Sequence, residues 1–168
     1  TLTQNKMTVV DHDGDDENSW QLHEPLLRRG EDEGTAVGEP TECALVNYAH
    51  SLGLGKPALK AAEPRVGEAP FDSMRKMMST VHQTSRGIAQ YTKGAPDEVL
   101  KLCTGYLENG EVKPMTEAKR GEILAANKAM ADRALRVLAA SFRLWDAVPA
   151  DCSPANLEQE LVLSALPV

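Results

Sequence analysis

The sequence has few aromatic residues and few cysteines. Phe, Trp and Tyr together make up only 4% of the 168 residues, so a site that stacks a planar ring has few candidate side chains. The three cysteines, Cys43, Cys103 and Cys152, lie far apart and form no CxxC pair. An odd number of cysteines without such spacing argues against a disulfide framework and favours a reducing, cytoplasmic setting.

Excess positive charge and long apolar runs are also missing. The formal net charge is -7, and an acidic domain is a poor general binder of nucleic acid because phosphate neutralisation needs a basic face. No apolar run approaches the roughly 20 residues needed to cross a bilayer, and the sequence contains no signal-peptide pattern. We therefore expect no nucleic-acid partner and no membrane insertion of this segment, although a few converging cations can still bind one small polyanion.

Familiar catalytic and metal-binding motifs are absent. The sequence contains no GxxxxGK[ST], GxGxxG, HExxH or GxSxG, and its four histidines lack metal-ligand spacing. The acidic loop 11–17 is similar to the start of an EF-hand, but Gly14 stands at loop position 4 instead of 6 and Leu22 occupies position 12, where a Glu belongs. The loop predicts a solvated turn and leaves a calcium-binding protein as an alternative. We expect no catalytic residue and no metal ligand in this chain.

What is present fits one compact domain. The chain is 42% hydrophobic and 26% charged, which is enough apolar material for a single core. Alternation and turn signals predict a fold of α+β class, an antiparallel sheet flanked by helices. The expected strands are 7–10, 20–22, 74–84, 87–93 and 136–143; the expected helices begin at Thr41, Pro96 and Thr116, the last ending near 134; residues 53–70, rich in Gly and Pro, are expected to form a loop.

The two ends of the sequence are unusual. The chain begins Thr1-Leu2-Thr3 and ends in the apolar, strand-like run 161–168. One interpretation is a terminal strand docked on the core. The other, which we favour, is a segment excised from a longer chain.

Five segments occur in an order that is typical of one protein family. They are TLTQNKMTV (1–9), GEPTECAL (38–45), PFDSMRKMMS (70–79), YTKGAPDEVL (91–100) and ALRVLAASFR (134–143). In this order they resemble the end of DKTGTLT, then GxPTExAL, FxSxxKxMS, KGAPE and LRVLAxAxR of the P-type ATPases. The resemblance spans nearly the whole chain and identifies it as similar to the nucleotide-binding (N) domain of a cation-transporting, calcium-pump-like member.

The resemblance implies a role for the whole chain as a single nucleotide-binding domain. Such a domain binds ATP, with Mg²⁺ on the nucleotide, and presents the γ-phosphate to an aspartate of a phosphorylation domain. That aspartate precedes Thr1 in the motif, so we expect the isolated chain to be inactive. Residues 1–9 and about 160–168 would connect to the phosphorylation domain, which with the actuator domain is the expected partner. The parent would be a pump, with this domain on the cytoplasmic face of a membrane and calcium the favoured cation.

The resemblance also implies a set of ATP-binding residues. They are Glu42, Phe71, Lys76, Met78, Lys93, Gly94, Arg136 and Leu138. Phe71 would stack on adenine, and its alternative is a core residue at a strand edge. The lysines and the planar fork of Arg136 would face phosphate, and their alternative is a solvated face or a surface ion pair.

The remaining positions have similar alternatives. Glu42 would accept a hydrogen bond from the adenine amino group, or would complement the dipole of its helix. Gly94 would let the ligand approach the backbone closely. Met78 and Leu138 would wall the pocket, or belong to the core.

Two positions depart from the family pattern. Ser73 stands where some calcium pumps carry an Arg near the phosphates, and Asp97 replaces the commoner Glu of KGAPE. These departures weaken any assignment to a subfamily. A nucleotide-binding regulatory module that has lost the pump remains an alternative function.

Overall fold

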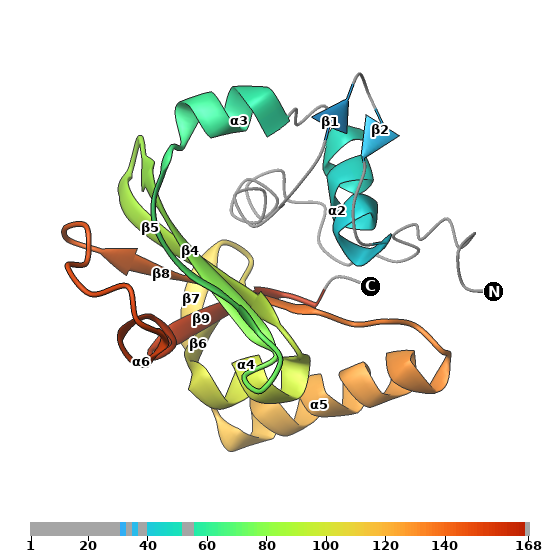
Figure 1. Cartoon of the computed structure of the whole chain (residues 1–168). Coiled ribbons are helices and arrows are strands. Elements are labelled where there is room, and N and C mark those ends of the chain that lie inside the picture. The colour runs from blue at the N-terminus through green and yellow to red at the C-terminus, as the bar shows by residue number, and fades with distance from the viewer. Residues whose placement is uncertain (1–30, 33–34, 37–39, 52–55, 167–168) are drawn as a thin grey trace.

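The computed structural model describes residues 31–32, 35–36, 40–51 and 56–166 (Figure 1). The expected strands 7–10 and 20–22 and the acidic loop 11–17 lie outside these residues. The short strands β1 (Glu31–Asp32) and β2 (Thr35–Ala36) pair with each other. All other described strands belong to one sheet.

The main sheet has seven strands in the order β3-β4-β5-β8-β9-β6-β7. Their bounds are β3 Arg65–Asp72, β4 Met77–Thr84, β5 Gly87–Gly94, β6 Cys103–Glu108, β7 Glu111–Pro114, β8 Ala139–Trp145 and β9 Leu161–Ala165. The α+β class is confirmed. One feature of the prediction was wrong, because β6 and β9 run parallel while the other neighbouring pairs are antiparallel. A long connection containing two helices and the strands β7 and β8 separates β6 from β9, which gives the chain room for a parallel return.

Five helices lie within the described ranges, and two of them start for reasons visible in the sequence. Their bounds are α2 Pro40–Ser51, α3 Lys56–Ala62, α4 Pro96–Leu102, α5 Glu117–Asp132 and α6 Pro154–Leu157. Pro96 opens α4, where its fixed φ suits a first helical residue and its missing N–H is not needed. The Thr116 hydroxyl caps α5 by accepting a hydrogen bond from the Lys119 amide at 3.1 Å. The helices expected at Thr41, Pro96 and Thr116 are confirmed.

The expectation that 53–70 forms a loop was wrong. Residues 56–62 form α3, and β3 begins at Arg65. Proline is tolerated here because Pro57 lies in the first turn of α3, and because Pro70 lies on an edge strand next to a bulge between Ala69 and Asp72. Gly67 fits the strand because a Cβ there would meet the Cys152 sulfur at 2.5 Å.

The hairpin around Ser85-Arg86-Gly87 is confirmed by the pairing of β4 with β5. The strand expected at 136–143 is also present, displaced to Ala139–Trp145. Leu161–Ala165 form an inner strand between β8 and β6, so the segment that we expected near a domain connection is part of this sheet.

The two faces of the sheet carry different helices. Figure 1 shows α4 and α5 on one side and α2 and α3 on the other. The main apolar core lies between α4 and the face that α4 and α5 cover. It is formed by Met77, Val99, Leu100, Cys103, Ala139, Leu161 and Leu163. The same face carries a second cluster of Ala69, Val81 and Leu157, where α6 packs. The opposite face carries a smaller cluster of Ala89, Tyr91, Ala140 and Phe142.

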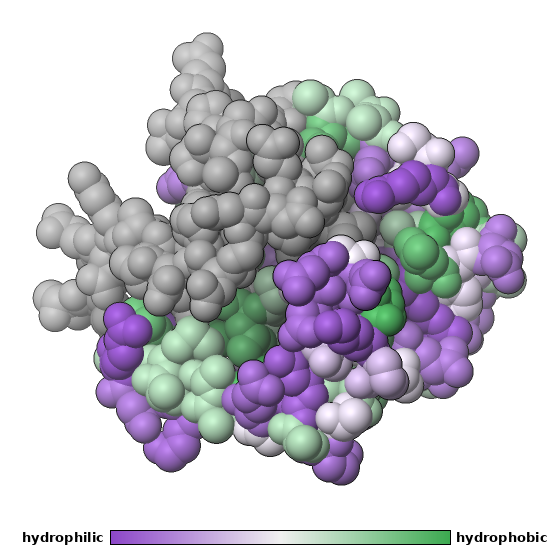
Figure 2. Space-filling view, turned by 180° about the vertical axis from the view of Figure 1, so that it is seen from behind, coloured by the Kyte–Doolittle hydropathy of each residue, from purple (hydrophilic) through white to green (hydrophobic). Residues whose placement is uncertain are grey.

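The surface and the cysteines agree with an ordinary globular domain. Figure 2 shows hydrophilic residues over much of the described surface seen from behind, with hydrophobic residues in small groups between them. The three cysteines are free, and burial raises the pKa of the Cys103 thiol to about 12. Within the described ranges, no helix has the length and apolar character needed to span a membrane.

Candidate functional site

Most of the predicted ligand-binding positions gather at one end of the sheet. In the antiparallel run β3-β4-β5-β8, β3 ends at Asp72, β4 begins at Met77, β5 ends at Gly94 and β8 begins at Ala139. Since neighbouring strands run in opposite directions, these four points lie at the same end. The predicted residues at this end are Phe71, Lys76, Met78, Lys93, Gly94 and Leu138.

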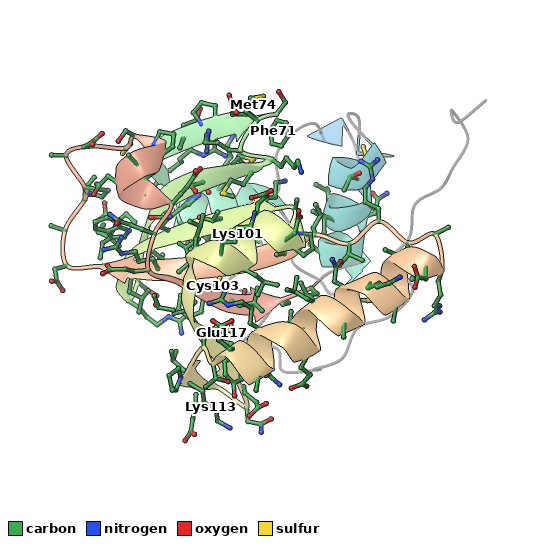
Figure 3. The ribbon with its side chains drawn as sticks, turned by 90° about the horizontal axis from the view of Figure 1, so that it is seen from below. Phe71, Met74, Lys101, Cys103, Lys113 and Glu117 are labelled. Carbon is green, nitrogen blue, oxygen red and sulfur yellow. The ribbon has the colours of Figure 1, made fainter. Side chains whose placement is uncertain are left out.

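Phe71 is an exposed aromatic residue at the end of an edge strand. Its side chain is 60% exposed, and Met74 in the following turn is 87% exposed. Figure 3 shows both at the outer edge of the molecule. The alternative that Phe71 is a core residue is wrong, because its ring faces solvent. Asp72 pairs with Met77, so side-chain alternation predicts that Phe71 shares the face of Met78.

The turn that carries Phe71 is held by the Asp72 carboxylate. Its Oδ1 accepts hydrogen bonds from the amides of Arg75 at 3.0 Å and Met74 at 2.8 Å. These bonds, that of Arg75 foremost, lower the pKa of the Asp72 carboxyl. Lys76 closes the turn with φ 55°, a left-handed conformation unusual for a side chain of its size, and its amide donates to the Asp72 carbonyl at 2.7 Å.

The two predicted lysines lie in different environments. Lys93 is only 6% exposed and lies in β5 between Met78 and Ala140, its Cα partners in the neighbouring strands. Lysine is seldom buried to this extent without a function or a partner for its charge. Lys76 is exposed, and its ammonium lies 3.8 Å from the Glu98 carboxylate on α4. The solvated-face alternative is therefore wrong for Lys93, and Lys76 turns toward the α4 side of the sheet.

Gly94 is needed for close packing of the chain on itself. A Cβ at Gly94 would meet the Lys76 carbonyl and the Met77 Cβ at 2.5 Å each. The Ala95 amide donates to the same Lys76 carbonyl at 3.0 Å. The absence of a side chain at Gly94 thus lets the β3–β4 turn pack closely against the backbone of β5. A larger residue here would displace the turn that carries Phe71 and Lys76.

The remaining predicted residues are less closely gathered. Leu138 is half-buried and immediately precedes Ala139, the Cα partner of Gly94. Arg136 is exposed in the segment that joins α5 to β8. Glu42 lies in α2, and its side chain is outside the described part of the structure. Met78 is 3% exposed, so it contributes to the interior of the sheet at this end.

Sequence reasoning missed a buried polar cluster further along the face that carries Lys93. On the same face, His82 Nδ1 donates to the Glu63 carbonyl at 2.9 Å, and the Tyr91 hydroxyl donates to the Glu63 carboxylate at 3.4 Å. Burial lowers the pKa of His82 and raises those of Glu63 and Tyr91. Among the described residues, Thr80 Oγ1 and His82 Nε2 are buried without a hydrogen-bond partner. The signal was available in the polar residues at alternate positions of β4.

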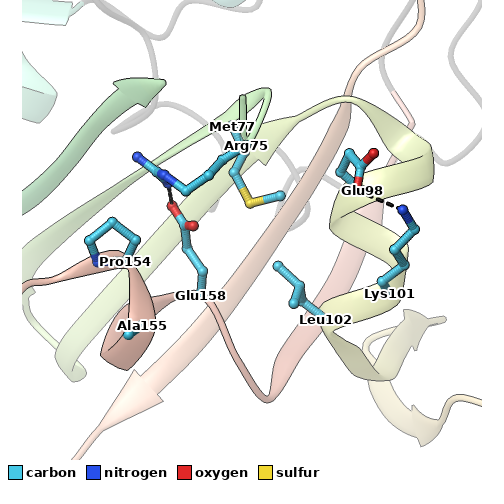
Figure 4. A pocket seen from close by; sticks show the side chains of 8 residues that line it. All are labelled: Arg75, Met77, Glu98, Lys101, Leu102, Pro154, Ala155 and Glu158. Atoms are coloured by element: carbon cyan, nitrogen blue, oxygen red, sulfur yellow. Dashed lines mark hydrogen bonds and ion pairs between the residues drawn. The ribbon is translucent and has the colours of Figure 1, made fainter. Parts of the chain in front are cut away.

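A hollow of about 310 Å³ lies on the other face of the sheet, under the β3–β4 turn. It is lined by Arg75, Met77, Glu98, Lys101, Leu102, Pro154, Ala155 and Glu158 (Figure 4). None of these is a predicted ligand-binding residue, and the hollow lies on the Met77 face while Lys93 and Met78 lie on the opposite one. Within the described ranges, no three His, Cys, Asp or Glu side chains lie together as a metal site.

Comparison with known proteins shows the family to which the chain is similar. The family model described as "P-type ATPase, cytoplasmic domain N" matches residues 21–166. The chain is 35% identical to calcium-transporting ATPase 1 of Bacillus cereus and 37% identical to a calcium-transporting ATPase of Listeria monocytogenes, each over 99% of this chain. It is 31% identical, over 77% of its length, to a probable cation-transporting ATPase F of Mycobacterium tuberculosis. The chain spans only 20% and 21% of the lengths of the first two relatives.

Proposed function

The chain belongs to the family of P-type ATPase cytoplasmic N domains, and we propose that it binds ATP and presents the γ-phosphate to an aspartate outside this chain. The proposal is carried by Phe71, an aromatic ring 60% exposed at the sheet end where Met78 and the buried Lys93 also lie. An exposed ring offers a stacking face, and a base stacked on an aromatic side chain contributes roughly 1–3 kcal/mol.

The proposed site divides the nucleotide between two kinds of residue. Phe71 receives the adenine ring, and Glu42 accepts a hydrogen bond from its amino group. Lys93 and Lys76 attract the phosphates as point charges, while the guanidinium of Arg136 offers paired donors. Met78, Leu138 and the backbone at Gly94 form the wall. Mg²⁺ arrives with the phosphates and supplies charge neutralisation there.

This division suits a domain without a nucleophile. Phosphoryl transfer needs mainly positioning and charge stabilisation, so one domain can hold the nucleotide while another supplies the acceptor. We propose that the acceptor belongs to a phosphorylation domain joined to residues 1–9 and to the end of this chain. An actuator domain of the same longer chain would be the other partner, and the isolated chain would not hydrolyse ATP.

The relatives suggest what the whole protein would do. Two are calcium-transporting ATPases and a third is a probable cation-transporting ATPase. We propose that the longer protein moves a cation across a membrane, with calcium favoured and this domain on the cytoplasmic side. Ion choice would depend on residues outside this chain.

The test is a nuclear magnetic resonance (NMR) titration of the 168-residue chain with ATP, AMP and GTP, with and without Mg²⁺. We expect saturable shifts at Phe71 and Lys93, stronger for ATP than for GTP. The expected affinity is in the tenths-of-millimolar to millimolar range, about -4 to -5.5 kcal/mol, because one open pocket gains little beyond the cost of association.

Phe71→Ala makes the test specific. We expect ATP to bind about 5- to 150-fold more weakly, which corresponds to the roughly 1–3 kcal/mol of base stacking. Met74→Ala is the matched control, because Met74 is 87% exposed in the same turn and has no proposed role. Unchanged affinity in Phe71→Ala would sink the stacking assignment. Equal losses in both variants would point to the turn as a whole.

A further inference from the structure

We propose that Arg75 and Glu158 are positioning residues of the nucleotide pocket, which hold the Phe71 turn in place from the opposite face of the sheet. The inference rests on the proposed function. It assigns a role to the hollow under the β3–β4 turn, one side of which is lined by the Arg75–Glu158 ion pair (Figure 4). Neither residue would touch the nucleotide.

Arg75 holds the chain on both sides of Phe71. Its guanidinium Nη2 donates to the carbonyl of Pro70, the residue before Phe71, at 2.8 Å. Its backbone amide donates to the carboxylate of Asp72, the residue after Phe71, at 3.0 Å. Its Nη1 forms an ion pair with Glu158. The side chain of Arg75 therefore links the Pro70 flank of the exposed ring to Glu158, while its backbone amide holds the Asp72 flank.

Glu158 is a rigid anchor for that link. Its side chain is only 6% exposed, and its amide donates to the Pro154 carbonyl at 2.8 Å at the end of α6. The preceding residue, Leu157, is fully buried, and its carbonyl accepts a hydrogen bond from the Gln90 amide group at 2.8 Å. Gln90 belongs to β5, an inner strand of the sheet. The turn is thus tied through Arg75, Glu158 and Leu157 to the centre of the sheet.

The link adds to the hydrogen bonds of Asp72 and the packing against Gly94, which hold the turn but do not reach Pro70, the residue before the ring. Phe71 and Met74 both face solvent, so apolar packing does not hold the ring. Ordering a mobile side chain on binding costs roughly 0.5–1.5 kcal/mol, and a ring held in place beforehand avoids that cost. A buried carboxylate paired with a half-buried guanidinium is a strong tether, since removing one partner leaves an uncompensated charge.

A second ion pair provides a matched control. Arg143 in β8 pairs with Glu160 at 2.6 Å and donates to the Gln159 carbonyl at 3.2 Å. The Arg143 side chain is 20% exposed, similar to the 26% of Arg75. Arg143 therefore holds the same segment between α6 and β9. These contacts lie outside the β3–β4 turn, so Arg143→Gln tests stability without touching the tether.

The experiment compares the unchanged 168-residue chain with Arg75→Gln, Glu158→Gln and Arg143→Gln. It records the relaxation of Phe71 ring and amide signals without nucleotide, the affinities for adenosine and ATP, and the midpoint of thermal unfolding. We expect Arg75→Gln to increase the mobility of Phe71 and to weaken adenosine binding about 3- to 10-fold. Glu158→Gln should do the same to a smaller extent, because the amide oxygen still accepts a hydrogen bond. Arg143→Gln should lower the unfolding midpoint alone.

The outcomes separate the inference from the function on which it rests. Unchanged Phe71 signals and unchanged adenosine affinity in Arg75→Gln would overturn the inference and leave the proposed function standing. An equal loss of affinity in Arg143→Gln would also overturn it, by showing a general effect of stability. Failure of the unchanged chain to bind adenosine or ATP would overturn the proposed function and the inference together. If Arg75→Gln does not fold, Glu158→Gln decides in the same way.

Discussion

The two faces of the same strands differ in how their buried polar side chains are paired. On the Met77 face, Ser79, Gln90, Thr92 and Ser141 are buried but all hydrogen-bonded, whereas the opposite face holds the unpaired Thr80 Oγ1 and His82 Nε2. On the face covered by α4, α5 and α6, the end of the sheet presents Met77 and Ala139, packed against Val99 and Leu161. On the opposite face, one residue along each strand, it presents Met78 and Lys93. Further along that face lie His82 and Tyr91, with the unpartnered hydroxyl of Thr80 between Met78 and His82.

We use this difference to assign the stability of the fold mainly to one face and the proposed nucleotide site to the other. Burial of apolar surface contributes about 25 cal/mol per Å², so the face under α4 and α5 accounts for much of the stability of the fold. Burial of an unpaired hydroxyl or ring nitrogen is unfavourable, and natural folds retain such groups mainly where they serve a site. We therefore propose that the nucleotide lies on the face of Met78 and Thr80, which we call the polar face for these unpaired groups, although the hollow of about 310 Å³ lies on the other one.

The largest expected effect comes from the apolar face. Leu161 is fully buried in β9, between β8 and β6. Leu161→Ala should lower the free energy of unfolding by about 2–5 kcal/mol, because it removes buried methyl groups and leaves a cavity. ATP affinity per folded molecule should not change. Urea unfolding and a titration below the unfolding midpoint measure the two quantities.

The control is Leu144→Ala in the neighbouring strand β8. Leu144 is 66% exposed, and its truncation should change stability by about 0.5 kcal/mol or less. A fall in ATP affinity in Leu161→Ala comparable with its loss of stability would contradict the separation of the two faces.

The next effect compares the two lysines. Lys93→Met removes the ammonium and keeps the length of the side chain. We expect it to weaken ATP binding by roughly 1.5–3 kcal/mol, the range for hydrogen bonds to charged groups, and adenosine binding by less. Lys76→Met should cost at most about 1 kcal/mol, because Lys76 is exposed and already lies 3.8 Å from Glu98.

Calorimetric titration with ATP and with adenosine distinguishes the outcomes for these lysines. Equal losses for ATP and adenosine in Lys93→Met would place the ammonium beside the base instead of the phosphates. A larger loss of ATP affinity in Lys76→Met than in Lys93→Met would mean that burial does not determine which lysine contributes more to binding.

Sequence patterns predicted the local elements well and the long-range ones poorly. Thr116 and Pro96 start helices because their own chemistry suits those positions, and such signals are visible without the fold. The segment 53–70 was wrongly predicted to be a loop because of its prolines. Pro57 is tolerated in the first turn of a helix, and Pro70 is tolerated in an edge strand. The parallel pairing of β6 with β9 depends on contacts between distant residues, which no local pattern reveals.

The candidate site divides in the same way. The exposure of Phe71 could be anticipated from its polar neighbours Asp72 and Ser73. The reason for Gly94 was found only from packing, since the space that a Cβ would occupy is filled by Lys76 and Met77. The pairing of Arg75 with Glu158 joins residues 83 positions apart. Such a contact follows from the sheet and not from any spacing in the sequence.

The smallest expected effect concerns pH and the polar face. Burial lowers the pKa of His82, with a further lowering by Arg65, while the hydrogen bond to the Glu63 carbonyl opposes it. The folded state therefore holds His82 neutral at a pH where the unfolded chain, with an ordinary histidine pKa near 6.5, takes up a proton. His82 contributes its full stability above about pH 6.5. That contribution falls as the pH decreases below 6.5 toward the folded pKa, with a slope of at most about 1.4 kcal/mol per pH unit.

Urea unfolding between pH 7.5 and 5.5 tests this prediction with His82→Gln as the comparison. The variant should lose stability less steeply below pH 6.5 than the unchanged chain. The other histidines and Glu63, whose pKa is raised by burial, are present in both proteins, so the difference between the two curves isolates His82. Leu161→Ala should shift the curve downward without changing its slope, because Leu161 carries no titratable group and lies on the face of the sheet opposite His82. Parallel curves for His82→Gln and the unchanged chain would show that the buried imidazole is not held neutral, and that the two faces do not differ in their response to protons.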